Sequence, residues 1–346
     1  SSLTHKFVAM PPFVSPLVWP LCHLHAALKG QVAPQRTTAQ GSMDIWDHVG
    51  SFLAATRSFL LALFCIFILH GGDDYPAFGS AKEMKLSWMW PIVCRNVLST
   101  ICICGFWDWF LYFSPWSGKL APYKFNPRYP TSRQILHDAV VTVQASVCGS
   151  VVEILICHLY AAGYVPSIVA ISDSPVVTCL WAVTITHWRI PHFWLIHRAM
   201  HPWKTDTVPD VGRFLYRHVH SLHHKSHNPT AFSGTNMHPV EASAYYSAAL
   251  ICLPFGVHPA VPLGCIIDCA VGAWLGHDGF QWPGSGDYFH YLHHAHFDCN
   301  YGARHVPIDL WFGTFAGTKD EVSRLWGRKP AGLDANETPL HADKAD

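Results

Sequence analysis

The sequence predicts an all-α integral membrane protein with about four transmembrane helices, a helical hairpin and a histidine-rich helical domain at the cytosolic face. Three observations lead to this fold class. Half of the 346 residues are hydrophobic and only 13% are charged, whereas soluble domains carry about 25% charged residues. Several apolar stretches are long enough to cross a bilayer. The 25 histidines cluster mainly beyond the last of the four candidate spans.

The N-terminus does not read as a clean signal peptide. Residues 1–30 are apolar but contain four prolines, which break helices. These are Pro11, Pro12, Pro16 and Pro20. We therefore expect 1–50 to be a poorly ordered N-terminal segment.

The transmembrane region is predicted to cover 51–196. Its candidate spans lie near 51–70, 90–113, 138–163 and 175–196. The first span is short and contains an arginine, so it is the weakest. The second and third contain Arg95, Asp108 and Glu153, which we expect to pair inside the helix bundle.

Basic residues in the loops predict the orientation. The loop 114–137 contains Lys119, Lys124, Arg128 and Arg133 but no acidic residue, so the positive-inside rule places it in the cytosol. Two crossings later, at residue 197, the chain is cytosolic again. The histidine clusters begin at this residue.

Two further apolar pieces, 242–255 and 260–275, are separated by prolines and a glycine. We interpret 242–276 as a helical hairpin that enters the membrane and returns to the same face. Histidine motifs precede and follow this hairpin in the sequence. They can meet only if the hairpin returns to the face from which it entered. The histidine-rich region then extends over 197–318, and 319–346 form a polar C-terminal tail.

Three histidine motifs dominate this region: HRAMH, HSLHH and HYLHH. Spacings of three and four residues place side chains on one helical face, so each motif can aim two or three imidazoles at one point. Imidazole is a good ligand for iron, zinc, copper and nickel. The motifs supply His197, His201, His220, His223, His224, His290, His293 and His294.

Two single histidines are predicted to complete the site: His238 in NMHPVEA and His277 in LGHDG. The ten nitrogens would provide about five ligands for each of two metal ions, and we expect no catalytic residue beyond these ligands. Asp278, Asp298 and Asp309 are candidates for orienting the imidazoles. We expect orienting or surface roles for the flanking His187, His192, His218, His227, His296 and His305.

In this order, HRAMH, HSLHH, MHPVE, GHDG and HYLHH resemble the fatty acid hydroxylase/sterol desaturase superfamily, in particular its sterol C-5 desaturase-like members. The upstream string NPRYPTSRQILHD is similar to the family's cytosolic loop. The resemblance implies that the ten histidines hold two iron ions, with zinc as an in vitro substitute. It also implies O₂ as oxidant, electrons from NAD(P)H through cytochrome b5 or a similar donor, and a location in the endoplasmic reticulum with the metal site facing the cytosol.

Three function classes stay open from the sequence. The leading interpretation is an O₂-dependent oxidoreductase that desaturates a sterol in the bilayer. The alternative is a hydroxylase of a sphingoid base or fatty-acyl chain on the same metal core. The third is a non-redox, histidine-rich metal-binding membrane protein; transporter ligands lie near the midplane, whereas these motifs lie at the ends of the spans. A net charge of zero argues against a nucleic-acid partner.

Overall fold

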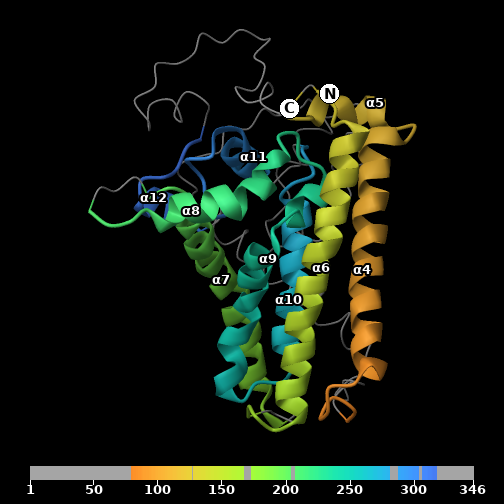
Figure 1. Ribbon diagram of the computed structural model, residues 1–346, viewed down its shortest axis with the longest axis vertical. Coiled ribbons are helices and arrows are strands. Elements are labelled where there is room, and N and C mark those ends of the chain that lie inside the picture. Colours follow the sequence, from red (N-terminus) through yellow and green to blue (C-terminus); the bar gives the residue numbers. More distant parts are fainter. Residues whose placement is uncertain are drawn as a thin grey trace, which may run out of the picture.

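The computed structural model describes residues 79–126, 128–166, 173–203, 207–280, 287–303 and 306–317. Within these ranges every extended element is helical, and the one β-type pairing is a bridge between Lys124 and Phe280. Figure 1 shows a bundle of long helices with shorter helices gathered at one end. The predicted segment 1–50, the first candidate span and the tail 319–346 lie outside the described residues.

Two long apolar helices form one side of the bundle. Helix α4 (Leu86–Asp108) continues directly into the π-helical η1 (Trp109–Phe113), and α6 (Ser132–Ala161) packs against α4. Both units, with 28 and 30 residues, exceed the ~30 Å of a bilayer core at about 1.5 Å per residue. The short α5 (Ser117–Leu120) and η2 (Ala121–Tyr123) lie in the connection between them.

Among the described helices, these two alone combine the length and apolarity of a membrane span. Their mean hydropathies are 1.4 and 2.0, and large apolar side chains of α4 such as Leu98 and Phe106 are exposed. These features indicate a membrane protein. The count of about four crossings stays a prediction.

Helix α7 (Pro175–Ala199) corresponds to the fourth candidate span and begins with proline at its first position, where proline is favoured. Arg189 of α7 forms a buried ion pair with Asp268, with Nε and Oδ2 2.9 Å apart. A second ion pair joins Arg95 of α4 to Glu153 of α6. Arg95 and Glu153 therefore pair inside the bundle, as expected, whereas Asp108 accepts a hydrogen bond from the backbone N–H of Ala231 (2.8 Å).

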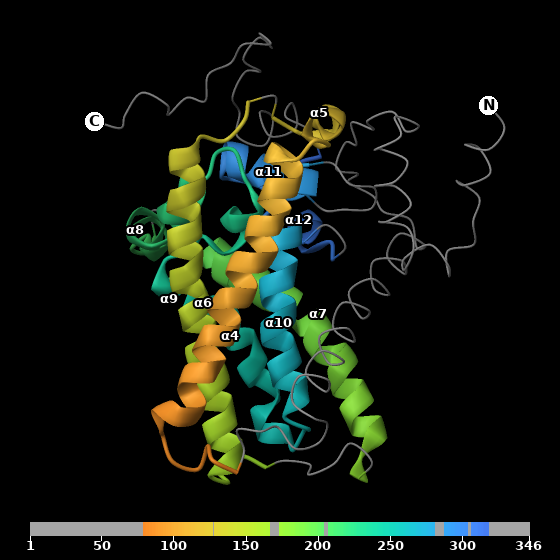
Figure 2. The same cartoon turned by 90° about the vertical axis from the view of Figure 1, so that its right-hand side faces the viewer.

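The segment predicted as a hairpin consists of α9 (Pro239–Tyr246), the 3₁₀ segment η6 (Ser247–Phe255) and α10 (Ala260–Leu275). Gly256 turns the chain between them with φ of 59°, a left-handed conformation that glycine adopts without strain. Figure 2 shows α10 between α6 and α7, both of which it contacts. The largest buried apolar cluster lies where these helices meet.

The remaining elements lie towards the end of the bundle that carries α5 (Figures 1 and 2). They are α8 (Val211–His218), η4 (His220–Lys225), η5 (Ala231–Thr235), α11 (Asp287–His296) and α12 (Ile308–Trp311). Helices α7 and α10 end in this region. The fold therefore brings the separate histidine motifs to one end of the bundle.

Candidate metal centre

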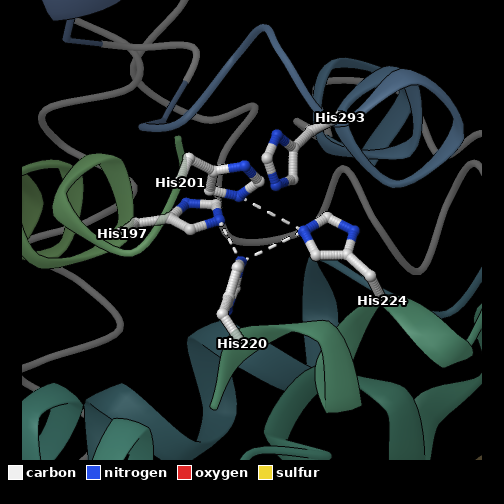
Figure 3. A group of neighbouring side chains, drawn as sticks. All are labelled: His197, His201, His220, His224 and His293. Atoms are coloured by element: carbon white, nitrogen blue, oxygen red, sulfur yellow. Dashed lines mark hydrogen bonds between the residues drawn. The ribbon is translucent and has the colours of Figure 1, made fainter. Parts of the chain in front are cut away.

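Nine of the ten predicted ligands converge in two groups, and the ligand atoms within each group lie within 4.8 Å of one another. All nine side chains are buried. The five-histidine group, drawn in Figure 3, contains His197, His201, His220, His224 and His293. The four-histidine group contains His223, His277, His290 and His294.

Each HxxHH motif divides its side chains between the two groups, although we expected each motif to aim at one point. In α11, His290 and His294 belong to the four-histidine group and His293 to the five-histidine group. In η4, His223 likewise separates from the other two histidines. The groups are therefore direct neighbours, and the ring centroids of His223 and His224 are 5.8 Å apart.

In five of these rings, a carbonyl or carboxylate oxygen next to Nδ1 determines which ring nitrogen carries the proton. An oxygen of this kind only accepts, so the Nδ1 next to it must donate, and the Nε2 lone pair is left free for a metal ion. Four rings donate to backbone carbonyls and His220 donates to Glu241. The pairs are His197–Tyr301 (2.6 Å), His293–Cys299 (2.7 Å), His277–Ala273 (2.7 Å), His223–Asn236 (3.2 Å) and His220–Glu241 (2.7 Å).

The free Nε2 atoms crowd together in a way that fits a cation. The Nε2 of His220 lies 3.0 Å from the Nε2 of His197 and 3.0 Å from that of His224 (Figure 3). Two lone pairs at this distance repel unless a positive charge lies between them. In addition, the buried Nε2 atoms of His277 and His290 have no hydrogen-bond partner, which is costly without a ligand.

Burial also keeps these rings in the neutral form that binds metal ions. Loss of hydration is the largest cause, and it lowers the pKa of His223 to about 4 and the pKa of His277 to about 3. Burial followed by the neighbouring imidazoles holds the pKa of His197 and His224 well below the usual value. At neutral pH these four rings are therefore neutral, and each has an unprotonated nitrogen that can bind a metal ion.

The donor set of both groups consists of imidazole alone, without carboxylate or thiolate in the part of the chain that the structure describes. Such a set suits iron, zinc, copper and nickel rather than calcium or magnesium. The two groups are not equivalent, because one offers five nitrogens and the other four. The residues thus fit two transition-metal ions with different coordination.

The structure does not bring His238, the expected tenth ligand, into either group. Its Nδ1 accepts a hydrogen bond from the backbone N–H of Val240 (3.2 Å) and caps the start of α9. The neighbouring Glu241 reaches the site instead, through His220. Proline at the first helical position and a preceding N-cap residue are signals that point to this capping role.

Sequence reasoning missed the groups that orient the rings. Asn236 accepts from His223 through its backbone oxygen, and its side chain donates to the buried Asp138 (2.9 Å). Asp309, which the sequence did suggest as an orienting residue, accepts from the backbone N–H groups of Tyr301 and Gly302 rather than from an imidazole. Backbone acceptors carry no residue signature, so the carbonyl groups that orient the rings could not be predicted from the sequence.

The residues that flank the histidine motifs contribute less to the two groups. His192 contacts Ser247 (3.1 Å), and His218 and His227 are exposed. Asp278 accepts from the indole of Trp107 and from the N–H of Phe280, both 3.0 Å away. His305 lies outside the described residues.

Comparison with known proteins adds to this geometry. The model of the family described as "Fatty acid hydroxylase" matches residues 181–314, which include all nine converging histidines. The chain is 25% identical to a putative Delta(7)-sterol-C5(6)-desaturase 2 of Arabidopsis thaliana, over 66% of this chain and 80% of that protein. It is also 25% identical to the lathosterol oxidase of Rattus norvegicus, over 72% of this chain and 84% of that protein.

A Delta(7)-sterol 5(6)-desaturase of Leptosphaeria maculans is 30% identical over 38% of this chain and 35% of that protein. No solved structure gives a significant match. The matched family and these relatives indicate an oxidoreductase.

Proposed function

Because the chain belongs to the fatty acid hydroxylase/sterol desaturase superfamily, we propose that it is a membrane-bound, non-haem di-iron oxidase that desaturates a sterol with O₂. The observation that carries the proposal is the convergence of nine buried imidazoles in two adjacent groups.

The five-histidine group would hold one iron ion and the four-histidine group the other, with zinc as a substitute in vitro. When bound, the metal pair supplies the redox chemistry with O₂ that acid and base side chains lack. In the overall reaction, the lipid loses two hydrogens to form a C=C bond, and O₂ takes up these hydrogens, two electrons and two protons to give two molecules of water. The electrons come from NAD(P)H through cytochrome b5 or a similar donor.

The protein's own part is to hold the imidazoles and keep water away. The Nδ1–H donors aim the Nε2 lone pairs inward, and the low pKa of the rings prevents protonation. Next to His277, the rings of Trp107 and Trp274 pack edge to face with centroids 5.5 Å apart. We infer that this aromatic side of the four-histidine group receives the lipid.

A sterol is the favoured substrate because several relatives are named as Delta(7)-sterol desaturases or lathosterol oxidase. Hydroxylation of a sphingoid base or fatty-acyl chain is the second candidate, since the matched family is described as fatty acid hydroxylase. The endoplasmic reticulum, with the metal site facing the cytosol, fits the basic loop 114–137 and the resemblance to eukaryotic members.

Expression in a host that lacks sterol C-5 desaturase, followed by sterol and sphingolipid profiling, tests the proposal. We expect the wild type to restore the sterol ring double bond, and His223→Ala to insert into membranes without turnover. His238→Ala, a histidine outside both groups, is the matched control and should keep activity. An unchanged sterol profile with new hydroxylated acyl chains would favour the second candidate.

A further inference from the structure

We propose that Asp309 and Asn300 are positioning residues for the five-histidine group. They fix the clamp segment, Cys299–Gly302, whose backbone carbonyls set the orientation of two ligands. This inference rests on the metal pair of the proposed function.

Two carbonyls of the clamp segment serve histidines that are distant in the sequence. The Nδ1–H of His197, from α7, donates to the oxygen of Tyr301 at 2.6 Å. The Nδ1–H of His293, from α11, donates to the oxygen of Cys299 at 2.7 Å. The clamp segment therefore fixes both the tautomer and the ring direction of two of the five ligands.

Asp309 holds the clamp segment from one side and is 2% exposed. Its Oδ1 accepts from the N–H of Tyr301 (2.9 Å) and the hydroxyl of Thr314 (2.6 Å), and its Oδ2 accepts from the N–H of Gly302 (2.8 Å). Hydrogen bonds to a carboxylate are stronger than those between neutral groups. The oxygen of Tyr301 shares a planar peptide unit with the N–H of Gly302, so the bond from Gly302 to Asp309 holds this oxygen in place.

The same carboxylate connects the clamp segment to α7. The indole Nε1 of Trp194 donates to Oδ1 of Asp309 at 3.2 Å, and Trp194 precedes His197 by about one helical turn. At Gly302, a Cβ would lie 2.9 Å from Cδ1 of Trp194 and 3.0 Å from Oδ2 of Asp309. The absence of a side chain at Gly302 permits this close packing.

Asn300 holds the clamp segment from the other side. It adopts a left-handed backbone with φ of 56°, which asparagine tolerates better than most residues. Its fully buried side chain donates to the oxygens of Phe289 (3.0 Å) and Ala316 (2.8 Å) and accepts from the N–H of Ala316 (2.8 Å). These bonds tie the clamp segment to α11 and to the chain that follows α12.

The four-histidine group uses different acceptors. The Nδ1–H of His223 donates to the backbone oxygen of Asn236, and that of His277 donates to the backbone oxygen of Ala273. Both acceptors lie outside the clamp segment. Release of the clamp segment should therefore loosen one metal ion and leave the other. A side chain needed only for folding would not discriminate between the two ions.

The test measures metal release from the full-length protein loaded with cobalt, by metal analysis and visible absorption during chelator challenge. Asp309→Asn turns the NH₂ group of the new amide towards one of the N–H groups that the carboxylate accepted from. Asn300→Gly keeps the left-handed backbone but removes three side-chain hydrogen bonds. We expect each variant to lose one of two ions about 10- to 100-fold faster than the wild type. The second ion should leave at the wild-type rate.

Asn228→Gly is the matched control, because this buried amide bonds to Arg128 and Lys124 rather than to the clamp segment. It should release both ions like the wild type. The inference is overturned if Asp309→Asn and Asn300→Gly keep both ions at the wild-type rate, or lose both together as they unfold. A wild-type protein that binds no metal would instead refute the proposed function.

Discussion

At His220, the two ring nitrogens face different partners: Nε2 faces the five-histidine group and Nδ1 donates to Glu241, 2.7 Å away. A carboxylate behind an imidazole fixes its orientation and makes it a better ligand. Because Gln can still accept the Nδ1 proton and Ala cannot, we expect Glu241→Ala to weaken binding of one metal ion about 10- to 100-fold. Glu241→Gln should lie between this variant and the wild type.

Competition with a chelator of known affinity measures this effect. Glu83→Ala, which removes an exposed carboxylate paired with Lys85, is the control and should bind both ions normally. Equal metal affinity in Glu241→Ala and the wild type would show that the Glu241 contact does not support the site.

His277 and His238 provide a direct comparison of two single histidines. The Nε2 of His277 belongs to the four-histidine group, whereas His238 caps α9. We expect His277→Ala to remove one metal ion, and His238→Ala to keep both while losing about 1 kcal/mol of stability with the N-cap. Metal analysis and thermal unfolding distinguish these outcomes. Loss of a metal ion in His238→Ala would restore it to the ligand set.

Acid should destabilise the metal-free protein. Burial lowers the pKa of His223 to about 4 and that of His277 to about 3, from 6.5 in the unfolded chain. The unfolded state therefore binds more protons than the folded state below pH 6.5. The stability that the two neutral histidines contribute is complete above pH 6.5, and it is lost as the pH falls towards their pKa values in the folded protein. Each such histidine contributes up to about 1.4 kcal/mol per pH unit.

Thermal unfolding of chelator-treated protein between about pH 6.5 and 5, above the range in which most carboxyl groups titrate, checks this expectation. The unfolding temperature should fall with pH, and less steeply in a His223→Gln, His277→Gln double variant. An unfolding temperature that rises on acidification would show that the rings gain protons on folding.

The HxxxH and HxxHH motifs were sufficient to predict eight of the nine converging histidines, because these spacings concentrate imidazoles whichever helix type forms. His277 was predicted as a single histidine. The motifs could not show how His223 separates from its neighbours, since η4 is a 3₁₀ helix whose geometry depends on tertiary contacts. They also could not show the carbonyls of Tyr301 and Ala273 as acceptors. Every residue carries a carbonyl, so its direction is a property of the fold.

At the scale of elements, apolar runs predicted helices within a few residues of their observed ends. The stretch 138–163 became α6 from Ser132 to Ala161. Its polar first turn, with Thr131 capping through a hydrogen bond from the N–H of Gln134 (3.2 Å), carries no apolar signal. Hydrophobicity therefore finds the buried or lipid-facing length of a helix and misses its capped start.

The contact between η5 and α10 depends on Gly234. A Cβ at this position would lie 2.3 Å from the backbone oxygen of Ala273, which also accepts from His277. The backbone cannot yield as a flexible side chain can, so Gly234→Ala should destabilise the protein by about 1–3 kcal/mol. It should also weaken metal binding by the four-histidine group.

Gly105→Ala is the control, since its Cβ would meet Cζ of Phe232 at an ordinary 3.8 Å. Thermal unfolding and metal release of the two variants give the comparison. Equal stability of Gly234→Ala and Gly105→Ala would mean that η5 and α10 separate easily.

For the whole molecule, two features set the orientation. The two apolar helices, α4 with η1 and α6, run along the bundle. The elements that carry the histidine groups lie at the end of the bundle near α5. The basic residues Lys119 and Lys124 lie in the connection at this same end. If both helices cross the bilayer, the turn after α6 must lie on the opposite side from the metal centre.

Gly118→Cys and Tyr164→Cys test this arrangement, because Gly118 has open space around it and Tyr164 is 72% exposed. In sealed endoplasmic reticulum vesicles, a membrane-impermeant maleimide should label the cysteine at 118 from the cytosolic side and the one at 164 only after permeabilisation. Peptide mass spectrometry separates these sites from native cysteines such as Cys102 and Cys179. Labelling of both sites in intact vesicles would mean that α6 does not cross, because a helix that spans the bilayer cannot present both ends to one compartment.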